Sequence, residues 1–278
     1  MVITGGNAGI GLETAVALAR QGSRVVFTAR DPARGAAALD EVRRRSGSDD
    51  VELMSLDLAS FASIRAFAAE VGRRYDRIDV LVNNAGGMLR KRTVTVEGFE
   101  TTFGVNHLGH FLLTELLREQ LVASAPSRIV VVASEAHRFA RRGLPFDDLQ
   151  SERRYSGWLA YSRSKLANVL HARELARRLA GTGVTANSLH PGYVNSRFAR
   201  DGDFGFERVQ ALGARAFAIS PEQGATTSVH LASSPEVEGI TGTYFARSKP
   251  KREAPKGRDD IAAARLWQVS EELVASVG

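Results

Sequence analysis

The first residues of the chain form a short apolar strand that leads directly into a glycine-rich turn. Residues 4–11 read Thr-Gly-Gly-Asn-Ala-Gly-Ile-Gly and precede an apolar helical face. Glycine allows a tight turn and close backbone approach, and a helix N-terminus presents free N–H groups to an anion. The order strand, glycine turn, helix therefore predicts a phosphate-binding β-α unit. The spacing of Gly5, Gly9 and Gly11 departs from G-x-G-x-x-G, which leaves a structural turn as the alternative.

The alternation of apolar strands and helical segments continues to the end of the chain. Near-continuous apolar strands are typical of parallel sheets that helices cover on both faces. Strands are expected at residues 2–3, 24–29, 51–56, 78–82, 129–132, 184–189 and 243–245. No linker or repeat divides the chain. We therefore expect one doubly wound α/β domain over residues 1–278, a Rossmann-type three-layer sandwich with a largely parallel seven-stranded sheet.

The composition of the chain excludes several kinds of chemistry and bears on its location. The chain has 278 residues, is 44% hydrophobic and contains no cysteine, which excludes disulfides and cysteine-based chemistry. It shows no secretory signal and no run of about 18 apolar residues, so we expect a cytoplasmic protein without a membrane span. The net charge of +6 raises nucleic acid as a partner.

The basic residues are nevertheless widespread, and the clusters at 138–142 with 153–154 and at 247–258 are interpreted as solvated loops. No zinc-finger spacing or ribonucleoprotein motif is present. We therefore predict no specific nucleic-acid partner and no metal site.

The second predicted strand ends in Ala29 and is followed by Arg30, Asp31 and a proline. In dinucleotide-binding folds an acidic residue at this point binds a free ribose 2′-hydroxyl, whereas an arginine suits a 2′-phosphate. Arg30 therefore favours NADP over NAD, with a solvated turn residue as the alternative, and Asp31 is expected to cap the next helix. Asp57 follows the third strand, where it is expected to accept a hydrogen bond from adenine or to cap a helix starting near Ser60.

Short polar side chains follow the next two strands. Asn83-Asn84-Ala85-Gly86-Gly87 leaves room for a ligand at the carboxyl edge of a parallel sheet. Ser134 follows residues 129–132 and is interpreted as a hydrogen-bond donor in the same crevice. A nucleophilic serine is disfavoured because no G-x-S-x-G elbow is present and His137 is too close in sequence to serve as its base.

Helical periodicity extends over residues 97–121 and places Asn106 on a buried stripe. A buried amide must be hydrogen-bonded, so a satisfied core asparagine is the alternative to a functional one. His110, one turn further on, is expected to have a packing role.

Tyr161-Ser162-Arg163-Ser164-Lys165 opens the next long helical segment. Residues four apart share a helix face, so the phenol of Tyr161 and the ammonium of Lys165 are expected to be neighbours. A nearby cation favours the phenolate and lowers the pKa of a phenol from about 10. The alternative is an exposed helix face, because this pair of residue types is common in helices.

Together these motifs occur in the order found in short-chain dehydrogenases/reductases of the classical type, which the chain resembles over essentially its whole length. The resemblance rests on Thr4-Gly5-x3-Gly9-Ile10-Gly11, Asn83-Asn84-Ala85-Gly86, Asn106, Ser134, Tyr161-x3-Lys165 and Pro191-Gly192. Ala29-Arg30-Asp31, the long gap from Ser134 to Tyr161, Ser164-Lys165-Leu166-Ala167-Asn168 and Leu266-Trp267 resemble the retinol dehydrogenase and WW-domain oxidoreductase-like branch.

The resemblance implies reversible NADP(H)-dependent hydride transfer between a carbonyl and a primary or secondary alcohol. It implies Tyr161 as general acid/base, Lys165 lowering its pKa and holding the nicotinamide ribose, Ser134 polarising the carbonyl, and Asn106 holding a water. The implied cofactor contacts are Gly5, Asn7, Gly9, Ile10, Gly11, Arg30, Asp57, Leu58, Asn83, Ala85, Gly86, Tyr161, Lys165, Pro191, Gly192, Val194 and Ser196.

Residues 193–220 are rich in phenylalanine and glycine, which indicates a lid over a small lipophilic substrate or else a packed insertion. A homodimer or homotetramer is expected. Two other functions stay open, a catalytically idle NADP-binding sensor or scaffold and an extended-type sugar-nucleotide epimerase or dehydratase. The complete Asn, Ser, Tyr and Lys set disfavours the first, and the absence of G-x-x-G-x-x-G disfavours the second.

Overall fold

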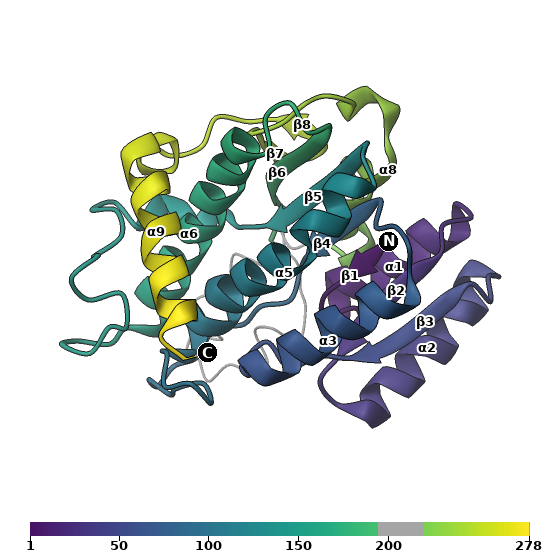
Figure 1. Cartoon of the computed structure of the whole chain (residues 1–278), viewed down its shortest axis with the longest axis horizontal. Coiled ribbons are helices and arrows are strands. Elements are labelled where there is room, and N and C mark those ends of the chain that lie inside the picture. The colour runs from purple at the N-terminus through teal and green to yellow at the C-terminus, as the bar shows by residue number, and fades with distance from the viewer. Residues whose placement is uncertain (194–218, 278) are drawn as a thin grey trace.

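The computed structural model describes residues 1–193 and 219–277 and contains one twisted sheet with helices on both faces (Figure 1). The strand order is β3-β2-β1-β4-β5-β6-β7-β8, and neighbouring strands are parallel except for β7 and β8. The strands are β1 (Val2–Ile3), β2 (Val25–Ala29), β3 (Val51–Ser55), β4 (Val80–Asn83), β5 (Ser127–Val132), β6 (Val184–His190), β7 (Tyr244–Ala246) and β8 (Lys249–Pro250). The predicted doubly wound α/β class is confirmed.

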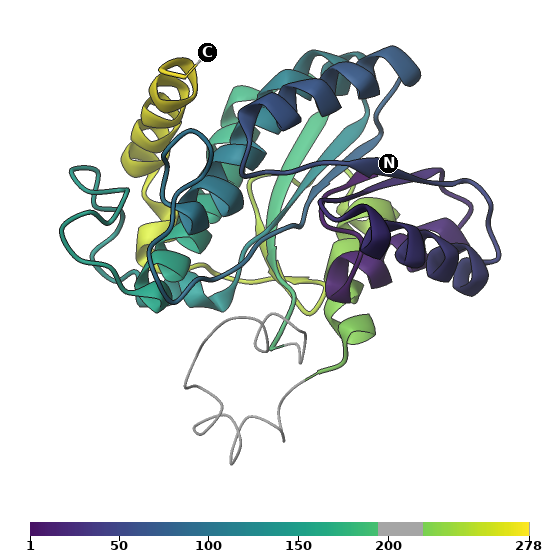
Figure 2. The same cartoon turned by 90° about the horizontal axis from the view of Figure 1, so that it is seen from below.

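Two layers of helices cover the sheet, as the view in Figure 2 shows. One layer holds α3 (Phe61–Arg74), α5 (Gly109–Ala123), α6 (Gly157–Arg178) and α9 (Asp260–Ala275). The other holds α1 (Gly9–Arg20), α2 (Pro32–Ser46) and α8 (Pro221–Ser233). Short helical segments are α4 (Thr101–Phe103), η1 (Gly104–Leu108), η2 (Glu135–Phe139), η5 (Pro235–Val237) and η6 (Pro255–Arg258).

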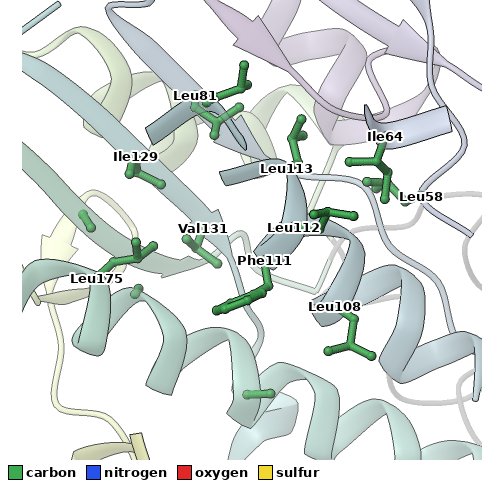
Figure 3. Close-up of a cluster of buried hydrophobic side chains, with 14 of the residues drawn as sticks. Leu58, Ile64, Leu81, Leu108, Phe111, Leu112, Leu113, Ile129, Val131 and Leu175 are labelled. Atoms are coloured by element: carbon green, nitrogen blue, oxygen red, sulfur yellow. The ribbon is translucent and has the colours of Figure 1, made fainter. Parts of the chain in front are cut away.

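The central strands show why the sheet is buried on both sides. Ile129 and Val131 of β5 pack into the layer of α5 and α6 and share one core cluster with Phe111 and Leu175 (Figure 3). Val130 and Val132, which alternate with them, belong to the core on the opposite face. Because successive side chains of a strand point to opposite faces, an uninterrupted apolar run fills both cores at once.

The order of connections defines the ligand edge of the sheet. β1 lies between β2 and β4, so the chain reverses direction across the sheet at β1 and β4. In open parallel sheets the crevice beyond the carboxyl ends of two such strands is where ligands bind. The turns at Thr4 and Asn84 therefore face each other at this crevice.

Two predicted elements differ from the structure. Within the described residues the sheet has eight strands instead of seven, because Lys249 and Pro250 pair antiparallel with β7 after a two-residue turn. A two-residue strand inside a basic loop carries no hydrophobic pattern. The helix expected over residues 97–121 begins at Thr101 and widens into a π-helical segment, η1, before α5 continues to Ala123.

Candidate active site

The glycine turn after β1 has backbone angles and close contacts that residues with a side chain would not tolerate. Gly5 and Gly9 have positive φ angles of 67° and 54°, and a Cβ on Gly11 would lie 2.2 Å from the Gly5 carbonyl oxygen. Ala8, the residue before α1, provides no side-chain cap for the helix N-terminus. The N–H groups of the first turn of α1 are therefore open to an anion, and the residues fit a dinucleotide pyrophosphate.

The turn after β4 is braced against the glycine turn by residues that the sequence interpretation did not assign. The Thr4 hydroxyl oxygen accepts hydrogen bonds from the N–H groups of Asn84 and Ala85, at 2.9 and 3.0 Å. The Asn84 amide donates to the carbonyl oxygens of Thr4 and Gly5. The doubled asparagine in the sequence was the available signal, but the sequence did not show which of the two faces the glycine turn.

Asn83 is one of the cofactor contacts that the family resemblance implies. Its side chain is buried, and its amide nitrogen donates to the Thr114 hydroxyl of α5 at 2.9 Å, so this nitrogen is used inside the fold. Gly86 lies close to two other predicted site residues, since a Cβ there would approach Asn106 Oδ1 to 2.9 Å and Lys165 Nζ to 3.4 Å.

The carboxyl ends of β2 and β3 carry the expected adenosine-side residues. Arg30 is exposed, and Asp31 caps α2 by accepting the Arg34 N–H at 3.0 Å. The predicted cap is therefore confirmed. Asp57 accepts the Ala59 N–H and is only half-buried, whereas Leu58 is buried against α5.

Ser134 and Tyr161 meet at the end of β5. The Ser134 hydroxyl hydrogen-bonds the Tyr161 phenol, and its oxygen also accepts the Ala136 N–H at 3.1 Å. His137 donates from Nδ1 to the Ser134 carbonyl oxygen and accepts the Ala254 N–H at Nε2. The imidazole thus contacts the backbone of Ser134 and not its hydroxyl, which agrees with a hydrogen-bonding serine.

Lys165 lies one turn beyond Tyr161 on α6, as the spacing predicts. Its ammonium is 5.7 Å from the centre of the Tyr161 ring and donates to the Val132 carbonyl oxygen at 2.9 Å. Burial lowers the pKa of Lys165 to about 8. Burial also raises the pKa of Tyr161 to about 12, against the opposing effect of the Ser134 hydroxyl. The expected lowering of the phenol pKa is therefore not found in the protein without its cofactor, because burial outweighs the hydrogen bond with Ser134.

Asn106 occupies the π-helical segment and is fully buried. Its side-chain oxygen accepts the Gly87 N–H at 2.8 Å, and its amide donates to the Gly87 carbonyl oxygen and to Ser164 Oγ, each at 2.9 Å. Ser164 in turn donates to the Tyr161 carbonyl oxygen. The side chain therefore joins the turn after β4 to the first turns of α6, and its polar atoms are all engaged.

The last expected contacts follow β6. Gly192 has a φ of 105°, and a Cβ there would clash with the Ile219 side chain at 2.3 Å. Pro191 immediately precedes it at the same edge of the sheet as Ser134. Val194, Ser196 and most of the proposed lid at 193–220 lie outside the described residues.

Two negative findings concern only the described residues. Within residues 1–193 and 219–277 no three His, Asp or Glu side chains gather as metal ligands would. In the same part of the chain, no helix has both the length and the apolar character needed to cross a membrane.

Comparison with known proteins places the chain among oxidoreductases. A family model described as short chain dehydrogenase matches residues 1–146. Retinol dehydrogenase 14 of Homo sapiens is 46% identical over 289 residues, which cover 99% of this chain and 85% of that protein. Retinol dehydrogenase 12 of Homo sapiens is 46% identical over 274 residues, with the same two shares.

Solved structures agree with this placement. The crystal structure of an uncharacterized protein from Mycobacterium Paratuberculosis has a TM-score of 0.79 and 36% identity, covering 99% of this chain and 92% of that one. The Pseudomonas aeruginosa RhlG/NADP active-site complex has a TM-score of 0.70 and 27% identity, covering 92% of this chain and 95% of that one. The chain is therefore an NAD(P)-binding oxidoreductase of the short-chain dehydrogenase family, in the branch that includes the retinol dehydrogenases.

Proposed function

We propose that the protein interconverts a carbonyl and a primary or secondary alcohol with NADP(H), using Tyr161 as general acid/base. The observation that carries this proposal is the convergence of four side chains from three elements at one edge of the sheet. Ser134 follows β5 and caps η2, Tyr161 and Lys165 lie on α6, and Asn106 belongs to η1. A phenol beside a serine hydroxyl and a buried ammonium can bind a substrate oxygen and exchange a proton with it.

The proposed roles follow from these contacts. Ser134 donates to the substrate oxygen and holds it next to the Tyr161 phenol. Tyr161 gives its proton to that oxygen in reduction and takes a proton from the alcohol in oxidation. Lys165 uses one N–H on Val132, and its remaining donors are available to a ribose hydroxyl and favour the phenolate. The bound cofactor supplies the hydride.

The preference for NADP over NAD is proposed from the end of β2. Arg30 is exposed there, while Asp31 is committed to capping α2. A cation suits a 2′-phosphate, and a free carboxylate for a 2′-hydroxyl is missing at this strand end. The solved RhlG structure named above is itself an NADP complex, which agrees with this choice.

We propose a small lipophilic substrate. Phe139 is 50% exposed and stacks edge-on against Trp158, with ring centres 5.3 Å apart, and Trp158 lies 6.1 Å from Tyr161. An aromatic row thus leads from the surface to the phenol, and the relatives are named retinol dehydrogenases.

Other properties remain predictions. They are the single domain over residues 1–278 with a lid at 193–220, a homodimer or homotetramer, and a cytoplasmic location.

The test is a screen of NADPH oxidation against aliphatic, aromatic and polyunsaturated aldehydes and ketones. We expect turnover with at least one lipophilic carbonyl, and faster turnover with NADPH than with NADH. A protein that binds NADPH but turns over none of the panel would instead favour the idle sensor, which requires cofactor binding alone.

A further inference from the structure

His110 is the buried side chain whose contacts the proposed reaction does not yet use. It is 2% exposed and lies in the first turn of α5. Both ring nitrogens have partners: Nε2 is 2.8 Å from the Thr4 hydroxyl oxygen and Nδ1 is 3.2 Å from the Asn106 carbonyl oxygen. Beyond satisfying a buried imidazole, these two partners belong to separate segments of the site, the glycine turn and η1.

Counting donors and acceptors fixes the direction of these hydrogen bonds. The Thr4 hydroxyl oxygen already accepts two N–H groups, from Asn84 and Ala85, which occupy its two lone pairs. Its own proton is therefore the one shared with His110 Nε2, and the Val82 carbonyl oxygen is more distant at 3.4 Å. With Nε2 as acceptor, a neutral His110 carries its proton on Nδ1 and donates it to the Asn106 carbonyl oxygen.

These bonds close a ring through the active site. Thr4 holds the turn after β4 at Ala85, and two residues later Gly87 exchanges two hydrogen bonds with the Asn106 side chain. The Asn106 carbonyl oxygen accepts from His110, which returns to Thr4. The ring therefore joins the glycine turn, the turn after β4 and the π-helical segment.

The ring is also connected to the groups that act on ligands. Thr4 is directly followed by Gly5 of the glycine turn. On the other side, Asn106 donates to Ser164 Oγ, and Ser164 donates to the Tyr161 carbonyl oxygen. A displacement of the glycine turn is thus transmitted to α6 along two hydrogen-bonded routes, one through the turn after β4 and a second, more direct one through His110.

We propose that His110 is a positioning residue that couples the cofactor-binding glycine turn to Asn106 and, through Ser164, to the helix turn that carries Tyr161. The proposal rests on the proposed function. It assigns no contact between His110 and substrate or cofactor.

The test is a double-mutant cycle between Thr4→Val and His110→Leu. For each variant the NADPH Kd, kcat, substrate KM and the thermal midpoint of the cofactor-free protein are measured. Both variants lose the Thr4–His110 hydrogen bond together with the other bonds of the altered side chain, and each is expected to weaken NADPH binding about two- to tenfold. The NADPH Kd of the double variant is expected to be no higher than the larger Kd of the two single variants, because both changes break the same ring.

Two further variants separate positioning from plain stability. His110→Asn keeps a donor near the position of Nδ1 and is expected to recover most of the kcat lost in His110→Leu while its Kd stays raised. His171→Leu removes another buried imidazole of the same helix layer, outside the ring, and is expected to lower the thermal midpoint with kcat and Kd unchanged.

Additive effects of Thr4→Val and His110→Leu on Kd would overturn the proposal, as would a His110→Leu variant that differs from the wild type only in thermal midpoint. If His110→Leu does not fold, His110→Asn takes its place in the cycle with the same two outcomes. Repeating the Kd measurements in a Tyr161→Phe background keeps the result independent of turnover. A failure of the proposed reaction would then be distinct from a failure of the coupling.

Discussion

Lys165 illustrates how a residue at this site depends on its surroundings. The helix spacing brings its ammonium near Tyr161, but its hydrogen bond goes to the carbonyl of Val132, and its pKa falls to about 8. The phenol keeps its proton, with a pKa of about 12. Protonated Tyr161 suits the reduction direction, and the charge state of Lys165 is what changes near neutral pH.

We therefore predict that kcat/KM for carbonyl reduction falls as pH rises through about 8. Below that pH Lys165 is charged, and above it the charged fraction drops about tenfold per pH unit. In Lys165→Arg, whose guanidinium stays charged, the decline should move beyond pH 10 in whatever activity remains. A wild-type profile that stays flat to pH 10 would argue against a role for the charge of Lys165.

Arg30 supports a second prediction at this scale. Arg30→Ala should weaken NADPH binding by about tenfold, the effect of losing a charge-assisted contact at an exposed site, and leave NADH binding within about twofold. Arg34→Ala, one helical turn away, is the matched control for the loss of positive charge alone. An unchanged ratio of the two Kd values would remove Arg30 from the phosphate site.

At the scale of elements, the turn between β1 and α1 leaves little space for an added side chain. A Cβ on Gly11 would lie 2.2 Å from the Gly5 carbonyl oxygen and 2.6 Å from Asn84 Nδ2, so both turns would have to move apart. Gly11→Ala is therefore expected to reduce NADPH affinity at least about tenfold and to lower the thermal midpoint.

Gly72→Ala is the matched control within helix α3. No atom lies within 4 Å of the added Cβ, so alanine should raise the free energy of unfolding by about 0.5–1 kcal/mol without changing NADPH affinity. Titrations of NADPH and urea unfolding of both variants would check the pair. Equal NADPH affinity in Gly11→Ala and Gly72→Ala would show that the glycine turn does not hold the cofactor.

The elements that could be predicted are those with a strong pattern of their own. The strand at 129–132 and the helix of Tyr161 were predicted because apolar runs and helical periodicity are local. β8 and η1 were not predicted. A two-residue strand leaves no such pattern, and neither does one additional residue in a helical turn. The links among Thr4, Asn84 and His110 depend on which turns meet in space, and that is decided by the whole sheet.

At the scale of the whole molecule, the buried histidines connect stability to pH. Burial lowers the pKa of His110 and His190 to about 4 and that of His171 to about 3. The unfolded chain, with histidine pKa values near 6.5, then binds more protons than the folded protein. The stabilisation is therefore complete above about pH 6.5 and is lost as pH falls toward 4.

We predict that the free energy of unfolding decreases between pH 6.5 and pH 5 by up to about 1.4 kcal/mol per pH unit for each such histidine. This window lies above the ordinary pKa of carboxyl groups, which keeps their contribution small. Urea unfolding across the window would measure the slope, and His171→Leu should make it shallower. The same slope in His171→Leu as in the wild type would mean that this imidazole does not contribute.

Tyr161 is proposed to transfer the proton, whereas binding of the cofactor depends mainly on other residues. The most direct measurement compares NADPH binding and single-turnover reduction in the wild type and Tyr161→Phe. Because phenylalanine keeps the ring and removes the hydroxyl, NADPH Kd should stay within about threefold while the rate falls by about 10²-fold or more. A Tyr161→Phe variant that reduces the carbonyl at nearly the wild-type rate would contradict the account.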